Sequence, residues 1–202
     1  MSEDPEEFNA MLQHFKNLFP GVQIFDSAEN FIKYIEKVSG TGMPFDFETM
    51  GAAFSNAIYL SDSATQEVIF HEYGHIYYGA LPDSDKAKQR INAVFGYREN
   101  MTKDELYELE ESIISAVGAY GSENYAEENK NKNIGFAAAL KDFWLSVKSI
   151  FSEGAKTEYE QFHRVRSIAI FANHIWTNKG NISSEQMSEN AIKYMKLGQE
   201  AW

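Results

Sequence analysis

Two histidines and a glutamate in the run His71-Glu72-Tyr73-Gly74-His75 have the residue types and the spacing of a catalytic zinc site. Residues i and i+4 lie on the same face of a helix, so His71 and His75 can each direct a ring nitrogen at one ion. Glu72 projects from an adjacent line of that surface, where it can accept a proton from water instead of binding the metal. The motif therefore predicts one Zn²⁺ per chain and the activation of water. The less specific interpretation is a helix with two surface histidines and an unrelated glutamate.

A catalytic zinc site usually has three protein ligands and an open position, so the third ligand has to come from another segment. The chain has no cysteine, which leaves histidine and carboxylate. His163 and His174 stand in a predicted C-terminal helix and are expected to have structural roles. The better source is the run Tyr120-Gly121-Ser122-Glu123-Asn124-Tyr125-Ala126-Glu127.

The motif His-Glu-x-x-His followed by Tyr-Gly-x-x-Asn-x-Ala-Glu resembles the catalytic domain of anthrax lethal factor and related gluzincin-type zinc metallopeptidases. The resemblance implies that the zinc ligands are His71, His75 and Glu127. It also implies that Glu72 is the general base and that Tyr120 donates a hydrogen bond to the oxyanion. A phenol suits that role, because a donor aimed at the developing negative charge stabilises the transition state.

The resemblance covers only residues 57–128, and it departs from the family pattern after the expected third ligand. Family members continue with apolar residues, whereas this chain continues with Glu128-Asn129-Lys130-Asn131. Glu123 lies one helical turn before Glu127 and is the second choice for the metal ligand. Glu128, the immediate neighbour, is the third choice.

The elements that position these residues are a helix and the strand before it. The motif helix is predicted over residues 63–79, and residues 56–61 form a short, β-prone segment. An exposed edge strand beside a metal cleft can hold an extended peptide by main-chain pairing, although the same segment can also pack beneath the helix. The candidate substrate contacts are therefore Asn56, Ala57, Ile58 and Tyr59.

The remaining pattern is mostly helical. Apolar periodicity predicts a strand over residues 22–25 and helices over residues 5–19, 27–40, 84–97, 102–121, 136–151, 155–178 and 183–202. Residues 42–56 have no helical period, and residues 121–135 are expected to include a polar surface loop. We expect one domain over residues 1–202, with the motifs in residues 57–128 and a C-terminal helical part in residues 135–202. The predicted class is α+β: a mostly helical, zincin-like metallopeptidase domain with a small N-terminal β-sheet.

Charge and hydropathy narrow the expected partners. Eighteen basic and thirty acidic residues give a formal net charge of −12, which disfavours nucleic acid as a partner. The N-terminus is acidic, with no apolar segment after it, and no stretch is long enough to span a membrane. A cytoplasmic protein, or one released without a Sec signal, is therefore expected.

The motifs favour a zinc metallopeptidase, most simply an endopeptidase, acting on a peptide or protein substrate. One alternative is a catalytically silent, metallopeptidase-like interaction protein or phage-associated structural protein. Another is a zinc-stabilised structural domain, which would need a fourth ligand such as His163 or His174.

Overall fold

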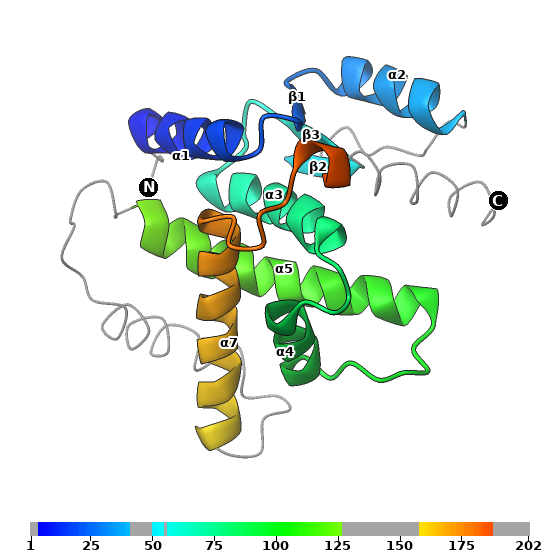
Figure 1. Cartoon of the computed structure of the whole chain (residues 1–202). Coiled ribbons are helices and arrows are strands. Elements are labelled where there is room, and N and C mark those ends of the chain that lie inside the picture. The colour runs from blue at the N-terminus through cyan, green and yellow to red at the C-terminus, as the bar shows by residue number, and fades with distance from the viewer. Residues whose placement is uncertain (1–3, 41–49, 55, 127–157, 188–202) are drawn as a thin grey trace.

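The fold combines a small sheet with helices that pack on it and on one another (Figure 1). A computed structural model of the chain describes residues 4–40, 50–54, 56–126 and 158–187. The helices are α1 (Pro5–Leu18), α2 (Ala28–Ser39), α3 (Gln66–Ala80), α4 (Lys86–Val94), α5 (Lys103–Ala126) and α7 (Glu158–Trp176). The strands are β1 (Gln23–Phe25), β2 (Gly51–Phe54) and β3 (Ala57–Leu60). The predicted α+β class is confirmed for the described residues.

Local signals in the sequence set the helix starts. The Ser27 and Thr65 hydroxyls accept hydrogen bonds from backbone N–H groups in the first turns of α2 and α3. At the start of α5, the Thr102 N–H donates to the Glu105 carboxylate at 2.7 Å, and the Glu105 N–H donates to the Thr102 hydroxyl at 3.2 Å. This reciprocal pair is a capping box, which satisfies two backbone donors without an intrahelical partner.

The sheet has the order β1-β3-β2, with β1 parallel and β2 antiparallel to β3. The predicted strand over residues 56–61 is therefore the central strand, and all four residues of β3 are buried. The prediction that it is an exposed edge strand is wrong, because neighbouring strands pair with it on both sides. β2 was not predicted, since its sequence Gly-Ala-Ala-Phe has little β-propensity.

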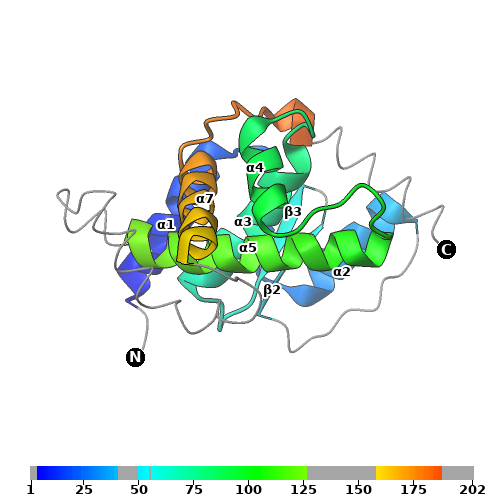
Figure 2. The same cartoon turned by 90° about the horizontal axis from the view of Figure 1, so that it is seen from below.

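The motif helix α3 lies between the sheet and α5, as Figures 1 and 2 show from two directions. Its inward side meets an aromatic core in which Phe15 of α1 stacks on Tyr73 with ring centroids 4.7 Å apart. α3 is buried on most of its circumference, which is typical of a central helix that other elements enclose. The motif residues are therefore held on a rigid element.

α5 is longer than predicted, because it continues through Gly121 to Ala126. Gly121 does not end the helix. A Cβ atom at this position would lie 2.3 Å from the Phe70 ring, so the missing side chain permits a close approach to α3. The predicted helix over residues 136–151 and most of the predicted loop lie outside the described residues.

α7 is described from Glu158 onward, since the predicted start of this helix lies outside the described residues, and the last predicted helix is described only at its start. There the Ser183 hydroxyl accepts the Gln186 N–H at 3.2 Å, and the Gln186 side chain accepts the Ser183 N–H at 2.8 Å. The helix start expected at Ser183 is thus present.

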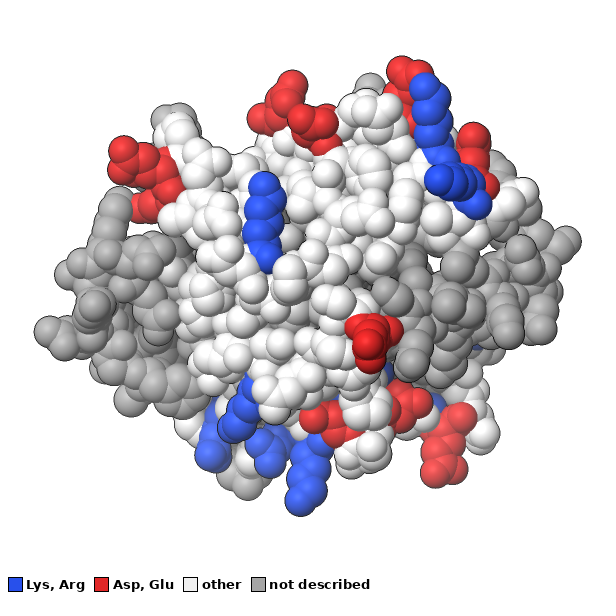
Figure 3. Space-filling model, turned by 45° about the horizontal axis from the view of Figure 1, so that its top comes forward, with Lys and Arg blue, Asp and Glu red and all other residues white. Residues whose placement is uncertain are grey.

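Surface charge is distributed unevenly on the face in Figure 3. Most of the acidic side chains lie toward its margin, and most of the basic side chains gather along its lower edge. Within the described residues, no helix is both long and apolar enough to cross a membrane.

Candidate metal centre

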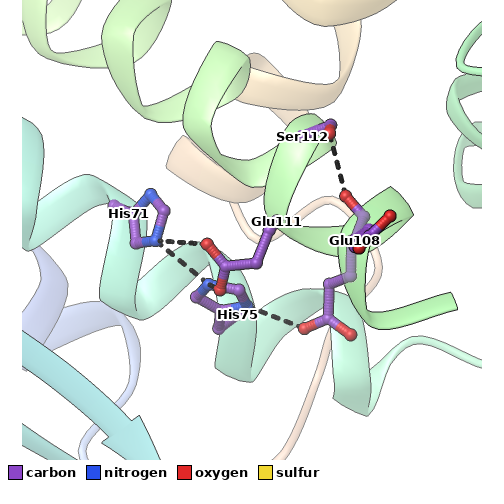
Figure 4. A network of polar contacts seen from close by, with 6 residues as sticks. His71, His75, Glu108, Glu111 and Ser112 are labelled. Carbon is purple, nitrogen blue, oxygen red and sulfur yellow. Dashed lines mark hydrogen bonds and ion pairs between the residues drawn. The ribbon is translucent and has the colours of Figure 1, made fainter. Parts of the chain in front are cut away.

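His71 and His75 point from the same face of α3 toward one position, as the helical spacing predicts (Figure 4). Their Nε2 atoms are 3.0 Å apart. Both side chains are mostly buried, with 21% and 15% of their surface exposed. The two imidazoles are thus positioned to share one ion.

The third group is Glu111, on α5. One oxygen of its carboxylate lies 2.8 Å from Nε2 of His75, and the other lies 3.6 Å from Nε2 of His71. The ligand atoms of these three residues lie within 4.8 Å of one another, and no other such group occurs in the part of the chain that the structure describes. The structure therefore assembles a His-His-Glu set between α3 and α5.

Close packing of α3 against α5 makes this approach possible. A Cβ atom on Gly118 of α5 would lie 3.3 Å from the backbone of His71, and one on Gly74 of α3 would lie 3.2 Å from Ile114. A larger side chain at either glycine would require the helices to shift. The small residues therefore bring the Glu111 side chain within reach of both histidines.

The donor set fits zinc in both chemistry and spacing. Zinc takes imidazole nitrogen and carboxylate oxygen at 2.0–2.2 Å, so ligands at the corners of a tetrahedron are about 3.3 Å apart. The observed separations are 2.8, 3.0 and 3.6 Å. An ion can thus be held with small side-chain adjustments, and three protein ligands leave one position open.

The structure brings Glu111, which is not among the predicted ligands, to the histidines. Glu127 lies outside the described residues. Glu123, the second choice, follows Glu111 by about 18 Å along the same helix, because each helical residue advances 1.5 Å. It is exposed and lies near Glu67, whose charge adds to burial in raising the pKa of Glu123. The sequence resemblance does not identify Glu111, because its second motif lies at the end of α5, about three to four helical turns beyond Glu111.

Tyr120, the predicted oxyanion donor, lies in the hydrophobic core with 2% of its surface exposed. It is not among the residues that line the cavity at the metal centre. Tyr107 does line the cavity, and its hydroxyl hydrogen-bonds to Glu111. The predicted role therefore does not fit the position of Tyr120, and Tyr107 is the phenol that the structure places beside the ligands.

Glu72 lies beside the two histidines and faces the same cavity. Only 7% of its surface is exposed. Burial raises the pKa of Glu72 to about 7, with the charge of Glu111 adding to the rise and that of His75 opposing it. A carboxylate with a pKa near neutrality is suited to accept and return a proton.

The two histidines differ in their affinity for protons in the metal-free protein. Burial and the charge of His75 lower the pKa of His71 to about 4, against a smaller opposing effect of Glu111. Burial also opposes a charge on His75, but hydrogen bonds and charges from Glu110 and Glu111 outweigh it and raise its pKa to about 10. A metal ion therefore has to displace a proton from His75.

A cavity of about 830 Å³ opens over the centre. β2, with its neighbour Met50, forms one wall. α3 lines the cavity with His71, Glu72 and His75, and α5 lines it with Tyr107, Glu110 and Glu111. None of Asn56, Ala57, Ile58 and Tyr59 is among the lining residues. The predicted substrate contacts thus do not face this cavity: Ala57, Ile58 and Tyr59 are buried in the central strand, and half-buried Asn56 directly precedes it.

The other histidines lie away from the centre. His14 stacks on Trp176 with ring centroids 3.6 Å apart, and a hydrogen bond of 2.5 Å joins Nδ1 of buried His174 to the Tyr77 hydroxyl. His163 is exposed, and neither His163 nor His174 lines the cavity. The described residues thus offer no fourth histidine ligand for a closed structural site.

Comparison of the chain with protein-family models, with curated proteins and with solved structures found no match.

Proposed function

We propose that the protein is a zinc-dependent metallopeptidase, similar in its chemistry to the gluzincins. The observation that carries the proposal is the convergence of His71, His75 and Glu111 in an open cavity, with the Glu72 carboxylate beside them. A zinc ion held by the first three residues would polarise the carbonyl group of a peptide bond and lower the pKa of water. The side chains around the zinc ion would carry out proton transfer and stabilise the developing negative charge.

Glu72 acts as the general base. Its carboxylate accepts a proton from the attacking water and passes it to the amine that leaves when the peptide C–N bond breaks. Burial of Glu72 supports this role, because it raises the pKa of the carboxyl group to about 7, where the group can both accept and release a proton at neutral pH.

Tyr107 is the donor for the negative charge that develops on the carbonyl oxygen. Its side chain is 66% exposed at the cavity, so a substrate can reach the hydroxyl. Tyr107 stands one helical turn before Glu111 on α5, on the same face. It thus replaces Tyr120 in the proposed mechanism.

The substrate lies along β2, the strand that forms a wall of the cavity beside α3. Gly51 permits β2 to approach α3 closely, since a Cβ atom there would lie 2.4 Å from Val68. An extended peptide in this cavity passes the three ligands and Glu72 together. β2 therefore takes the place of β3 as the element that positions the substrate.

The test combines metal analysis with a cleavage screen on a peptide library, followed by mass spectrometry. The native chain should bind one equivalent of zinc and cleave peptides. Glu72→Gln should keep the zinc and lose about 10²–10⁴-fold in kcat, because it removes the base but no ligand. Glu108→Gln, with the same charge change at an exposed position on α5, serves as the control and should cleave like the native chain.

Tyr107→Phe should also retain zinc and lose about 10²-fold in kcat. A chain that binds no zinc would overturn the proposal. A chain that binds zinc but cleaves nothing would support the silent scaffold instead. Cleavage by Glu72→Gln at the native rate would refute the mechanism.

A further inference from the structure

His75 lies between two consecutive carboxylates of α5. Glu111 approaches its Nε2 atom at 2.8 Å, and Glu110 approaches its Nδ1 atom at 2.7 Å. Both ring nitrogens of His75 are therefore engaged by carboxylates. Only the first of these contacts belongs to the proposed ligand set.

The backbone of α5 explains how neighbouring residues reach opposite sides of one ring. Successive side chains on a helix point about 100° apart, so Glu110 and Glu111 diverge from the helix axis. The His75 ring fits between them. Glu110 is 22% exposed and lines the cavity, so its carboxylate lies close to the metal centre. It is not one of the three residues whose ligand atoms converge there.

We infer that Glu110 is a positioning residue for the metal centre, acting through His75. Its carboxylate accepts the proton on Nδ1, which fixes the tautomer with a free lone pair on Nε2 and holds the ring toward the ion. The negative charge also makes Nε2 a stronger donor to a cation. This inference rests on the proposed zinc site, and it assigns a role to a residue that binds neither metal nor substrate.

The two histidines of the proposed metal site differ in the hydrogen bonding of their Nδ1 atoms. Within the described residues, Nδ1 of His71 has no hydrogen-bonded carboxylate comparable to Glu110. The ring of His75 is therefore the better oriented of the two. Loss of Glu110 should therefore lower the zinc affinity by disturbing the orientation of the His75 ring, and it should leave His71 unaffected.

The test measures zinc affinity directly, by competition with a chromophoric chelator at fixed pH and ionic strength. Glu110→Ala removes both the charge and the hydrogen-bond acceptor, and it should raise the zinc Kd about 10–100-fold. Glu110→Gln keeps an acceptor oxygen on a side chain of the same size but removes the charge, so it should raise the Kd less than the alanine variant does. Circular dichroism of both metal-free variants shows whether they fold.

Glu108 provides the matched control. It is exposed on the same helix, and Glu108→Ala and Glu108→Gln change the net charge of the chain by the same amount. Both variants should bind zinc as the native chain does. The absorption spectrum of the cobalt(II) form gives a second readout, since an altered ring orientation shifts its visible bands, whereas a general loss of stability does not.

The results separate this inference from the proposed function. If the native chain binds no zinc, the metal site itself is refuted. If the native chain binds zinc and the folded Glu110 variants match it in Kd and cobalt spectrum, the positioning role is refuted. Equal weakening by the Glu108 variants would also overturn it, because the effect would then come from overall charge.

Discussion

Replacement of Glu111 should remove most of the stabilisation that zinc confers on the folded protein. In the proposed function, zinc would bind only the folded chain, at a site that the tertiary structure assembles, and would raise the free energy of unfolding by RT ln(1 + [Zn]/Kd). At a free zinc concentration 100-fold above the native Kd, this is about 2.7 kcal/mol. For a chain of this size, the corresponding rise in Tm is about 5–11 °C.

The loss follows from the geometry of the centre. The Glu111 carboxylate supplies one of three converging ligands, at 2.8 and 3.6 Å from the two imidazole nitrogens. Removing a group that only orients a ligand weakens metal binding by about 10–100-fold, so removing a ligand should weaken it by at least 100-fold. At the same zinc concentration, the stabilisation of Glu111→Gln then falls to about 0.4 kcal/mol, which is a rise in Tm of about 1–2 °C.

The assay is thermal unfolding of each variant with chelator and with buffered zinc. The quantity compared is the zinc-dependent change in Tm, because Glu111 also pairs with His75 in the metal-free protein and its loss changes the starting Tm. Glu123→Gln is the control on the same helix, and it should keep the full zinc-dependent shift. A full shift in Glu111→Gln, or its loss in Glu127→Gln instead, would refute the ligand set.

Three further predictions concern the packing that holds the centre. The Tyr73 hydroxyl is buried and has no hydrogen-bond partner among the described residues, whereas the Tyr77 hydroxyl hydrogen-bonds with His174 at 2.5 Å and accepts the Gly180 N–H at 3.0 Å. In chemical denaturation, Tyr73→Phe should therefore be neutral or stabilising and Tyr77→Phe should cost about 1–3 kcal/mol; the reverse order would contradict this assignment. Burial lowers the pKa of His174; the charge of Asp85 opposes this effect and that of Lys179 adds to it. The unfolded chain therefore binds more protons than the folded chain, and the free energy of unfolding should fall as the pH drops below about 6.5. A native Tm that falls no more steeply than that of His174→Gln between pH 8 and pH 5 would show that His174 does not contribute. Gly121→Ala should destabilise the chain by about 1–3 kcal/mol despite the better helix propensity of alanine, because its Cβ would overlap Phe70; an increased midpoint in urea would argue against that contact.

Features that depend on neighbouring residues could be predicted from the sequence. The pair His71 and His75 requires only a helix, since four residues bring two side chains to one face. Helix starts followed from capping residues such as Ser27 and Thr102, whose side chains satisfy backbone donors within the same turn. The mostly helical class followed from apolar periodicity for the same reason.

The sheet was harder to predict, because its stability comes from partners distant in sequence. The sequence of β2 has little intrinsic preference for a strand, and it is ordered by antiparallel pairing with β3. Pairing of β1 on the other side then makes β3 the central strand. Strand order therefore decides that β2, and not β3, lines the cavity along which the proposed substrate would lie.

The third group of the candidate metal centre depends on contacts between helices. The sequence alone predicts that α3 offers two imidazoles and a carboxylate, and that a further ligand comes from another segment. Which residue supplies it depends on how α5 is offset along α3, and a shift of one helical turn moves every side chain by about 5.4 Å. Contacts at Gly74, Gly118 and Gly121 set that offset, and with it they select Glu111.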